Sequence, residues 1–261
     1  MRKALLTAMM VAGVLTSGCS ADAIQNAKKG DIITFGSYEQ DANTANGREP
    51  VEWEVLYVSD DNVLVVSRYV LDCVPYNTKM KNVTWENCTL RAWLNNGFYN
   101  AAFSAEEQER IMESHVINRD NAFDGTQGGS DTRDKVFCLS VDEVYRHYDF
   151  NAIHDEDGLR SSEALITEAT PHASGHHVFT CEITNEVYEE MLKPDDYSEA
   201  CIGRTVASWW LRTSGSASEP EIHYGSDCAC IVANFGETGW DEGAYVVLDF
   251  IGVRPALRLK R

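Results

Sequence analysis

The chain has 261 residues, the length of one large domain or two small ones. Hydrophobic residues make up 44% of it and charged residues 24%, so it can bury a sizeable core and is neither a disordered protein nor a coiled coil. It carries 22 basic and 41 acidic side chains, which gives a net charge of −19. A negative field of this size repels phosphate backbones and anionic headgroups, so we expect no nucleic-acid partner and no electrostatic docking on a membrane.

The N-terminus has the features of an export signal. Arg2 and Lys3 precede residues 4–18, which contain no charged side chain. This uncharged stretch is shorter than the roughly 20 apolar residues of a transmembrane helix, and it is typical of a secretory signal peptide. We therefore predict that residues 1–18 are a signal peptide that is removed on export.

Small residues lead from this stretch into a cysteine, in the sequence Leu15-Thr16-Ser17-Gly18-Cys19. The segment resembles the bacterial lipobox, in which the cysteine thiol receives diacylglycerol and becomes the new N-terminus. The resemblance implies a lipid on Cys19 that anchors the protein to the outer face of the bacterial cell membrane. The alternative is an ordinary secretory signal with an incidental cysteine. Residues 19–29 are typical of a tether, and we expect a single domain over residues 30–261.

The first part of the domain has the pattern of three antiparallel strands. Residues 32–40 form a β-rich run, followed by a turn cluster with Asn46-Gly47. Residues 51–58 alternate between apolar and acidic side chains, as a half-buried strand does. Residues 63–71 are almost continuously apolar, which suits a central strand. We predict that short turns join these strands into a meander.

Helix signals follow the strands. The apolar side chains spaced for one helix face are Leu90, Trp93, Leu94 and Phe98. Capping boxes at Ser104–Glu107 and Ser140–Glu143 predict two helix starts, with a short strand over residues 135–139 before the second. Residues 150–200 show weak periodicity, and we interpret them as an irregular insertion with one helix near residues 185–192.

Strand patterns return after the insertion, over residues 205–212, 228–235, 244–250 and 253–259, with loops at 215–221 and 236–243. Trp209 and Trp210 are adjacent in a strand and therefore point to opposite faces. Arg212 and Arg254 lie near strand ends, where a guanidinium group can tie several backbone carbonyl groups. We expect these four side chains to serve packing rather than a ligand.

Seven segments follow one another in a specific order: GDIITFGSYEQD, EPVEWEVLYV, TWENCTLRAWLN, FSAEEQERI, DKVFCLSVDEV, WWLRTSG and GVRPAL. The series, over about residues 30–259, resembles the domain of unknown function 6273, a family of secreted proteins and lipoproteins of anaerobic Gram-positive bacteria. The chain departs from the family pattern in the greater length of residues 150–200. It also departs at Thr213-Ser214, where the family tends to Ser-Pro.

The resemblance implies an α+β fold, with antiparallel sheets, a few flanking helices and one irregular insertion. The family is similar to C-type-lectin-like and formylglycine-generating-enzyme-like folds, which also pair a Trp-rich strand with a closing Gly-x-Arg strand. A C-type-lectin-like core is therefore expected. Because a fold does not determine a function, the functional residues are sought separately.

Two loops between the late strands carry the side chains that we predict to bind a ligand, because loops on a rigid scaffold commonly carry function. An exposed tryptophan beside carboxylates can stack on a sugar while the carboxylates bind its hydroxyl groups. The alternative is that Trp240 packs inward and the acids only solvate a turn. The predicted ligand-binding residues are Glu219, Glu221, His223, Tyr224 and Asp227 in one loop and Trp240, Asp241 and Glu242 in the other.

We expect an extracellular, non-catalytic module that binds a glycan, a cell-wall polymer or a protein, and we assign no catalytic residue. The alternative is a cell-envelope oxidase or related enzyme on a formylglycine-generating-enzyme-like scaffold, which would use Cys228 or Cys230. Sulfur atoms in a solvent-reachable pocket would favour the oxidase, whereas burial in strands would favour the binding module.

Two groups of possible metal ligands lead to no prediction of a metal or a cofactor. His172, His176, His177 and Cys181 have the chemistry of zinc donors, but in an irregular insertion we interpret them as solvated side chains. The second group has no EF-hand spacing and is interpreted as an acidic surface loop: Asp120, Asn121, Asp124, Asp131 and Asp134.

The chain contains eight cysteines, and a lipid on Cys19 would leave an odd number. Cys73 and Cys88 flank a turn-rich segment and are the candidate disulfide pair. A bridge that closes a loop of about 15 residues would contribute roughly 3 kcal/mol in the chain-entropy account.

Overall fold

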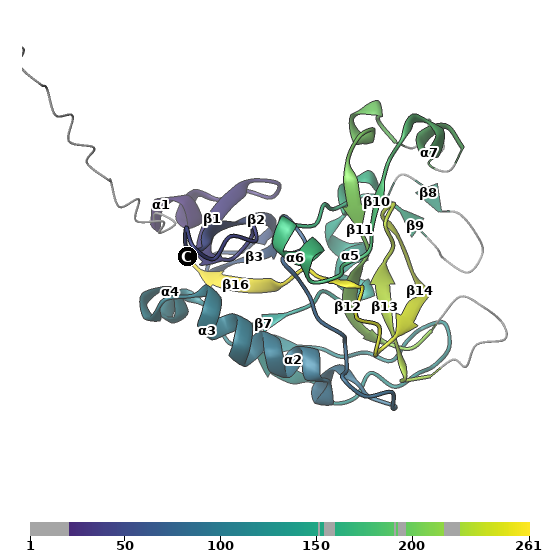
Figure 1. Cartoon of the computed structure of the whole chain (residues 1–261). Helices are drawn as coiled ribbons and strands as arrows, with labels where there is room; N and C mark the ends of the chain where they lie inside the picture. The colour runs from purple at the N-terminus through teal and green to yellow at the C-terminus, as the bar shows by residue number, and fades with distance from the viewer. Residues whose placement is uncertain (1–20, 151, 154–159, 191, 193–196, 217–224) are drawn as a thin grey trace, which may run out of the picture.

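Two sheets carry the fold (Figure 1). The computed structural model describes residues 21–150, 152–153, 160–190, 192, 197–216 and 225–261. The first sheet has the strand order β1-β2-β3-β16-β7. Its strands are β1 (Ile32–Tyr38), β2 (Glu49–Val58), β3 (Asn62–Ser67), β7 (Val136–Phe137) and β16 (Ala256–Lys260). The predicted meander is confirmed, because β2 pairs antiparallel with both β1 and β3.

The second sheet has the order β4-β15-β12-β13-β14-β9-β8, and its pairs are antiparallel except for β12 with β15. Its strands are β4 (Asp72–Cys73), β8 (Ala152–Ile153), β9 (Arg160–Ser161), β12 (Trp209–Ser214), β13 (Cys228–Val232), β14 (Glu237–Tyr245) and β15 (Gly252–Val253). Two short antiparallel ribbons are β5 (Ser114–Val116) with β6 (Thr132–Asp134) and β10 (Thr180–Glu182) with β11 (Thr205–Ala207). The α+β class with mainly antiparallel sheets and few helices is thereby confirmed.

Short helices flank the sheets, and Figure 1 shows α2, α3 and α4 along one side of the five-stranded sheet. The helices are α1 (Ala21–Asn26), α2 (Thr89–Trp93), α3 (Tyr99–Ala102), α4 (Ala105–Arg110), α5 (Val141–His147), α6 (Pro171–Gly175) and α7 (Asn185–Glu190). Single 3₁₀ turns occur at Trp85–Asn87, Glu163–Leu165 and Glu199–Cys201. Among the helices of the described residues, none combines the length and the apolar character that crossing a membrane requires.

The helix signals of the sequence are confirmed. A π-helical turn over Leu94–Phe98 joins α2 to α3, so residues 89–102 form one continuous helix. Its buried face contains Leu90, Leu94 and Phe98, as the spacing predicts. Both capping boxes form at the starts of α4 and α5, with the serine and glutamate side chains bonded reciprocally to the backbone.

Buried arginines tie the strands together, as expected for Arg212 and Arg254. Arg212 donates hydrogen bonds to the carbonyl oxygens of Cys138 and Ile117 and forms an ion pair with Glu143. Arg254 donates to the Ser67 carbonyl at 2.7 Å, forms an ion pair with Glu54 and lies over the Trp209 ring. Trp209 and Trp210 are both fully buried, which confirms their packing role.

The N-terminal tether is shorter than predicted. Residues 21–26 form α1, and Ile24 and Ala27 are buried in the main hydrophobic core. These two apolar side chains are three positions apart and therefore share one face of the helical turn. The polar composition of this segment hid that apolar face, so the segment belongs to the folded domain rather than to a free linker.

The predicted insertion has a small core of its own. Strands β8 to β10, helices α6 and α7 and a separate group of buried side chains organise the described part of residues 150–200. The expected helix is confirmed as α7. The buried group consists of Ile166, Ile183, Tyr188, Leu192, Tyr197, Cys201 and Val206. Its members are spread too widely along the chain to give a local periodic signal.

The late strands also differ from the prediction. Strand β14 occupies residues 237–245, where the sequence indicated a loop over 236–243 and a strand over 244–250. Its pairing with β13 is interrupted by a bulge between Cys230 and Val232. Gly243 packs so closely that a Cβ atom there would lie 1.5 Å from the Ser216 carbonyl oxygen. The glycines that suggested a loop instead serve an irregular, tightly packed strand.

We predict that Glu143→Gln lowers the free energy of unfolding by about 3 kcal/mol at neutral pH, because Arg212 then stays buried without its charged partner. Burial raises the pKa of the Glu143 carboxyl, but the charge and hydrogen bonds of Arg212 outweigh burial, so the net pKa is lowered. A lowered pKa stabilises the fold above the unfolded-state pKa, and this contribution is lost as the pH falls through the folded-state pKa.

Urea denaturation at neutral and acidic pH measures both effects. Acidification should cost the variant less stability than it costs the parent chain. The control is Glu106→Gln, which changes an exposed side chain in the first turn of α4 and should stay within about 0.5 kcal/mol. Equal effects of the two substitutions would contradict the role assigned to the buried pair.

Candidate metal centre

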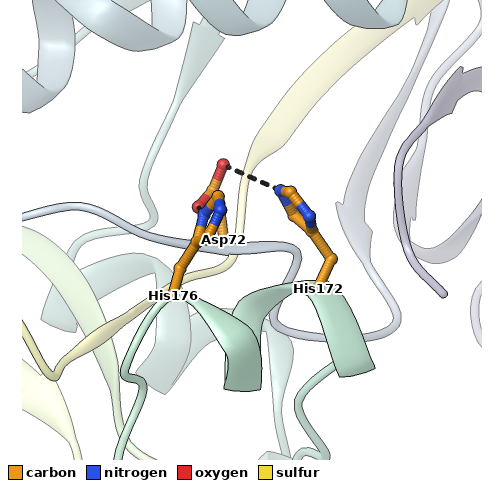
Figure 2. Close-up of side chains that lie close together, drawn as sticks. All are labelled: Asp72, His172 and His176. Atoms are coloured by element: carbon orange, nitrogen blue, oxygen red, sulfur yellow. Dashed lines mark hydrogen bonds and ion pairs between the residues drawn. The ribbon is translucent and has the colours of Figure 1, made fainter. Parts of the chain in front are cut away.

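Three side chains from distant parts of the sequence meet beside β4, at the edge of the seven-stranded sheet (Figure 2). They are Asp72 of β4, His172 of α6 and His176 directly after α6. His176 Nδ1 lies 2.8 Å from Asp72 Oδ1, and His172 Nε2 lies 3.8 Å from Asp72 Oδ2. One donor atom from each side chain lies within 4.8 Å of the others. These three residues are termed the Asp-His-His cluster.

The local sequence of α6 sets the spacing of the histidines. The Thr170 side chain accepts a hydrogen bond from Ala173 N, and Pro171 occupies the first helical position, where no N–H donor is needed. His172 and His176 are four residues apart and therefore lie on the same side of the helix, with ring centroids 4.1 Å apart. The helix thus presents two imidazoles together.

Backbone pairing brings α6 to Asp72. Val70 N donates to the Glu168 carbonyl, and Thr170 N donates to the Val70 carbonyl, both at 3.0 Å. Val70 lies two positions before Asp72, and Thr170 lies two positions before His172, so this pairing sets the ligands against each other. On its other side, β4 pairs antiparallel with β15, which fixes the backbone of Asp72 in the sheet.

Tyr38 of β1 orients the Asp72 carboxylate. Its hydroxyl donates to Asp72 Oδ2 at 2.5 Å, and its ring lies edge-on to the His172 ring at 5.7 Å. Burial and the negative charge of Asp72 raise the pKa of the Tyr38 phenol, so the hydroxyl keeps its proton and remains a donor. The other oxygen, Oδ1, accepts from Cys73 N at 2.7 Å and faces His176.

The Asp72 carboxylate is buried, and a cation beside it would be favourable. Its side chain is 7% exposed, and among the described residues its only ion-pairing partners are His172 and His176. A buried carboxylate without a cation is costly, and a protonated imidazole or a metal ion can supply the positive charge. The His176 side chain is 50% exposed, so solvent and ions can reach the cluster.

The donor set suits a transition-metal ion. Imidazole nitrogens with one carboxylate oxygen are ligands for zinc and for non-haem iron. A tetrahedral zinc ion with bonds of about 2.0–2.1 Å spaces its donor atoms about 3.3 Å apart. The two imidazoles face different oxygens of Asp72, at 2.8 Å from Oδ1 and 3.8 Å from Oδ2, so one oxygen would bind the ion after a small adjustment of the side chains. Three protein ligands would leave one position for water or for an oxygen atom of a bound ligand.

A family model described as Domain of unknown function (DUF6273) matches residues 60–261. The chain belongs to this family. The resemblance expected from residue 30 is thus shown from residue 60 onward, so the three members of the Asp-His-His cluster lie within the DUF6273 match and Tyr38 lies outside it. No curated protein and no solved structure matches the chain.

Within this DUF6273 chain, the histidine group of the sequence is only partly assembled. His172 and His176 join Asp72, whereas His177 and Cys181 are not part of the cluster. Cys181 lies in β10, and its Sγ donates to the Glu182 carbonyl. The interpretation of these side chains as solvated is corrected for His172, whose side chain is 16% exposed because it packs against Asp72.

The acids of the 120–134 loop accept hydrogen bonds from within the loop and from neighbouring elements. Asp120, Asp124 and Asp131 each accept a hydrogen bond from a backbone N–H at 2.7–3.0 Å. Asp134 is buried and forms an ion pair with Arg91 at 2.6 Å. These contacts provide each carboxylate with a donor, in part from distant residues such as Arg91 and Ser216.

The predicted ligand residues lie largely outside the described residues, and Asp227 and Glu242 belong to neighbouring parts of one sheet, directly before β13 and in β14. Asp227 lies in the turn before β13, where its carbonyl accepts from Val246 N at 2.9 Å. Trp240, Asp241 and Glu242 lie within β14 rather than in a loop. Outside the described residues are Cys19, Glu219, Glu221, His223, Tyr224 and the side chains of Trp240 and Asp241. Binding at these residues stays a prediction.

The seven cysteines of the described residues are free thiols. The predicted Cys73–Cys88 disulfide is not formed, because the two thiols serve different elements. Cys73 Sγ donates to the Asp249 carbonyl at 3.0 Å, whereas Cys88 Sγ accepts from Arg91 N at the start of α2.

Cys228 and Cys230 lie in β13 and are fully buried. Burial raises the pKa of the Cys228 thiol to about 12, so it stays protonated at neutral pH. Burial in a strand leaves neither sulfur atom in a solvent-reachable position.

Sequence reasoning missed Asp72 and Tyr38. Asp72 ends an apolar run, and Tyr38 lies in another strand pattern, so neither position stands out. The available signal was the four-residue spacing of His172 and His176 next to a helix start at Thr170-Pro171. That spacing identifies two ligands and cannot identify a third from a distant strand.

We predict that Tyr38→Phe lowers the free energy of unfolding by about 1.5–3 kcal/mol, because the buried Asp72 carboxylate loses a donor. The matched control is Tyr99→Phe, since the Tyr99 hydroxyl lies 3.5 Å from the Gln108 carbonyl oxygen and forms a weak bond at best. Urea denaturation without added metal compares the two variants. A loss no larger than that of the control would refute the orienting role of Tyr38.

Proposed function

We propose that this protein is an exported domain, anchored by a lipid on Cys19, that binds a divalent transition-metal ion through Asp72, His172 and His176. The observation that carries the metal proposal is the meeting of two imidazoles and a buried carboxylate from segments 104 positions apart. A second support is that Asp72 has no lysine or arginine partner among the described residues.

The bound ion would give the domain a ligand-binding role. Its remaining coordination position can accept an oxygen atom from a glycan, a cell-wall polymer or a protein side chain, which are the ligand classes expected from the sequence. We keep the non-catalytic module as the proposed class. The described residues around the cluster position the metal-binding side chains through hydrogen bonds and strand pairing. An ion that holds a ligand needs no further acid or base.

A C-type-lectin-like core remains part of this proposal. It is supported by the parallel pairing of the Trp209 strand with Gly252, which begins the closing Gly-x-Arg segment. The relation concerns the arrangement of strands, so it carries no information about the ligand. The metal ligands come from β4 and α6, outside that strand pair.

We predict that the purified mature protein binds zinc with one-to-one stoichiometry and that Asp72→Asn and His176→Ala each weaken binding by about 100-fold or more. Changing residues that only orient metal ligands already costs about 10–100-fold, so losing a ligand should cost at least as much. Isothermal titration calorimetry on metal-free protein measures the affinity. Binding should release protons and weaken at acidic pH, because the ligands must be deprotonated.

The matched control is His115→Ala. His115 also pairs with a carboxylate, at 3.2 Å from Asp131, but this exposed pair has no second histidine. The His115→Ala substitution should leave the affinity for zinc unchanged. Zinc binding that survives both cluster substitutions, or that falls equally in the control, would overturn the proposed site. Circular dichroism of each variant verifies that the fold is retained.

For the anchor, we predict that Cys19→Ala releases the protein from membranes or leaves it as an unprocessed precursor. The cause is the loss of the only thiol to which the proposed lipid is attached. Metabolic labelling with a palmitate analogue, followed by fractionation, compares the variant with the parent chain. An unlabelled parent chain would reject lipidation without bearing on the metal site.

A further inference from the structure

A second pocket contains none of the residues of the Asp-His-His cluster. It has a volume of about 470 Å³ and opens between β2, β16, the end of α5 and the segment that follows α1. This volume falls in the range of small-molecule sites. The residues that line it are Lys29, Leu56, Tyr57, Arg146, His147 and Arg258.

The pocket has the opposite charge to the rest of the molecule. Three cationic side chains and no carboxylate line it, in a chain with a net charge of −19. Arg258 donates one hydrogen bond, to Asn62. In the part of the chain that the structure describes, the exposed side chains of Lys29 and Arg146 have no ion-pair or hydrogen-bond partner. Their charges are therefore available to an incoming anion.

The cations converge on one buried imidazole. Burial lowers the pKa of His147, and the charges of Arg146, Arg258 and Lys29 lower it further, against the opposite effect of Glu143. Glu143 forms its ion pair with Arg212 and does not line the pocket, although its charge reaches His147 and Arg258. Lys29, Arg146 and Arg258 come from three separate segments, which makes the convergence a product of the fold rather than of a local basic run.

The walls supply the remaining contacts of a binding site. Leu56 is buried, and Tyr57 is 47% exposed with its ring 6.0 Å from the His147 ring. A phenol hydroxyl can donate to an anionic oxygen, and the ring offers an apolar face to the rest of a ligand. The pocket has more space and more positive charge than a small monovalent anion requires.

We propose that this pocket binds a phosphate group carried by a larger ligand. Guanidinium and ammonium groups are the usual phosphate partners in proteins, because they combine charge with several N–H donors. Two arginines and one lysine around a single cavity match the charge and the several acceptor oxygens of a phosphate ester. The metal proposal is independent of this site.

The position of Lys29 indicates a source for the phosphate. Lys29 is ten positions after Cys19, so under the proposed anchoring the pocket would lie close to the headgroups of the outer membrane surface. The net negative charge predicted no such docking, but repulsion between distant charges is screened beyond about 8 Å at physiological salt. The proposed lipid anchor would also raise the local concentration of headgroups at the pocket. A soluble phosphate ester has the same chemistry, and the test separates the two sources.

The test uses the mature protein in two arms, with the double variant Lys29→Gln/Arg146→Gln. Calorimetry in non-ionic detergent measures the affinity for inorganic phosphate, which does not depend on anchoring. Amide hydrogen exchange of residues 56–58 and 145–148 is then compared in vesicles of phosphatidylcholine alone and with added phosphatidylglycerol. The matched control is Lys81→Gln/Arg133→Gln, which removes the same charge from two exposed side chains elsewhere.

The double variant should weaken phosphate binding by about tenfold or more, and the control should not. Slower exchange with phosphatidylglycerol, abolished by the double variant only, supports the headgroup as the source. Phosphate binding with exchange in both kinds of vesicle equal to that in non-ionic detergent overturns the headgroup source and supports a soluble phosphate ester. Phosphate affinity that is absent, or equal in the parent chain and the double variant, overturns the pocket whatever the state of Cys19.

Discussion

The backbone pairing of residue 70 with residues 168–170 is the contact on which the metal centre depends. It joins β4, which has two residues, to the start of α6, which has five. Elements this short are not stable by themselves. The distance between Asp72 and the two histidines is therefore a property of the tertiary structure. Any ion held there would in turn join the two segments and stabilise the folded state against the unfolded one.

Buried charge serves the same purpose elsewhere in the molecule. Arg254 lies between β15 and β16, at the point where the chain passes from the seven-stranded to the five-stranded sheet. Its guanidinium group binds the backbone at the end of β3 and the carboxylate of Glu54 in β2. A side chain that reaches both partners fixes the crossover, which apolar packing alone would leave free to slide. The ion pair with Glu54 and the hydrogen bond to the Ser67 carbonyl offset part of the cost of burying this charge.

The sequence predicts those features that depend on neighbouring residues. The two capping boxes, the alternation of residues 51–58 and the helix face of Leu90, Leu94 and Phe98 are local patterns, and each has its expected structure. Features that depend on distant residues cannot be predicted from such local patterns. The third member of the cluster, Asp72, is selected by pairing across about a hundred positions, and no local pattern records that pairing.

Two failures of sequence reasoning have a more specific cause. The glycines at 236, 239 and 243 resemble a loop, but Gly243 lies in β14 because the backbone of Ser216 leaves no room for a side chain. Residues 150–200 resemble an unstructured insertion because the apolar side chains of its small core are scattered among polar ones. In both cases the glycine-rich or polar composition is real. The packing that determines the structure involves residues distant in the sequence, so a local pattern does not record it.

Strand β16 lies between β3 and β7, although it is formed by residues 256–260. Val66 pairs with Ala256, so about 190 residues must be synthesised after β3 before this sheet can close. Until then, β3 has an open edge and the buried side chains of Val63 to Val66 lack one of their neighbouring strands. If the protein is exported in an unfolded state, β3 keeps this open edge until the residues of β16 are also available for pairing.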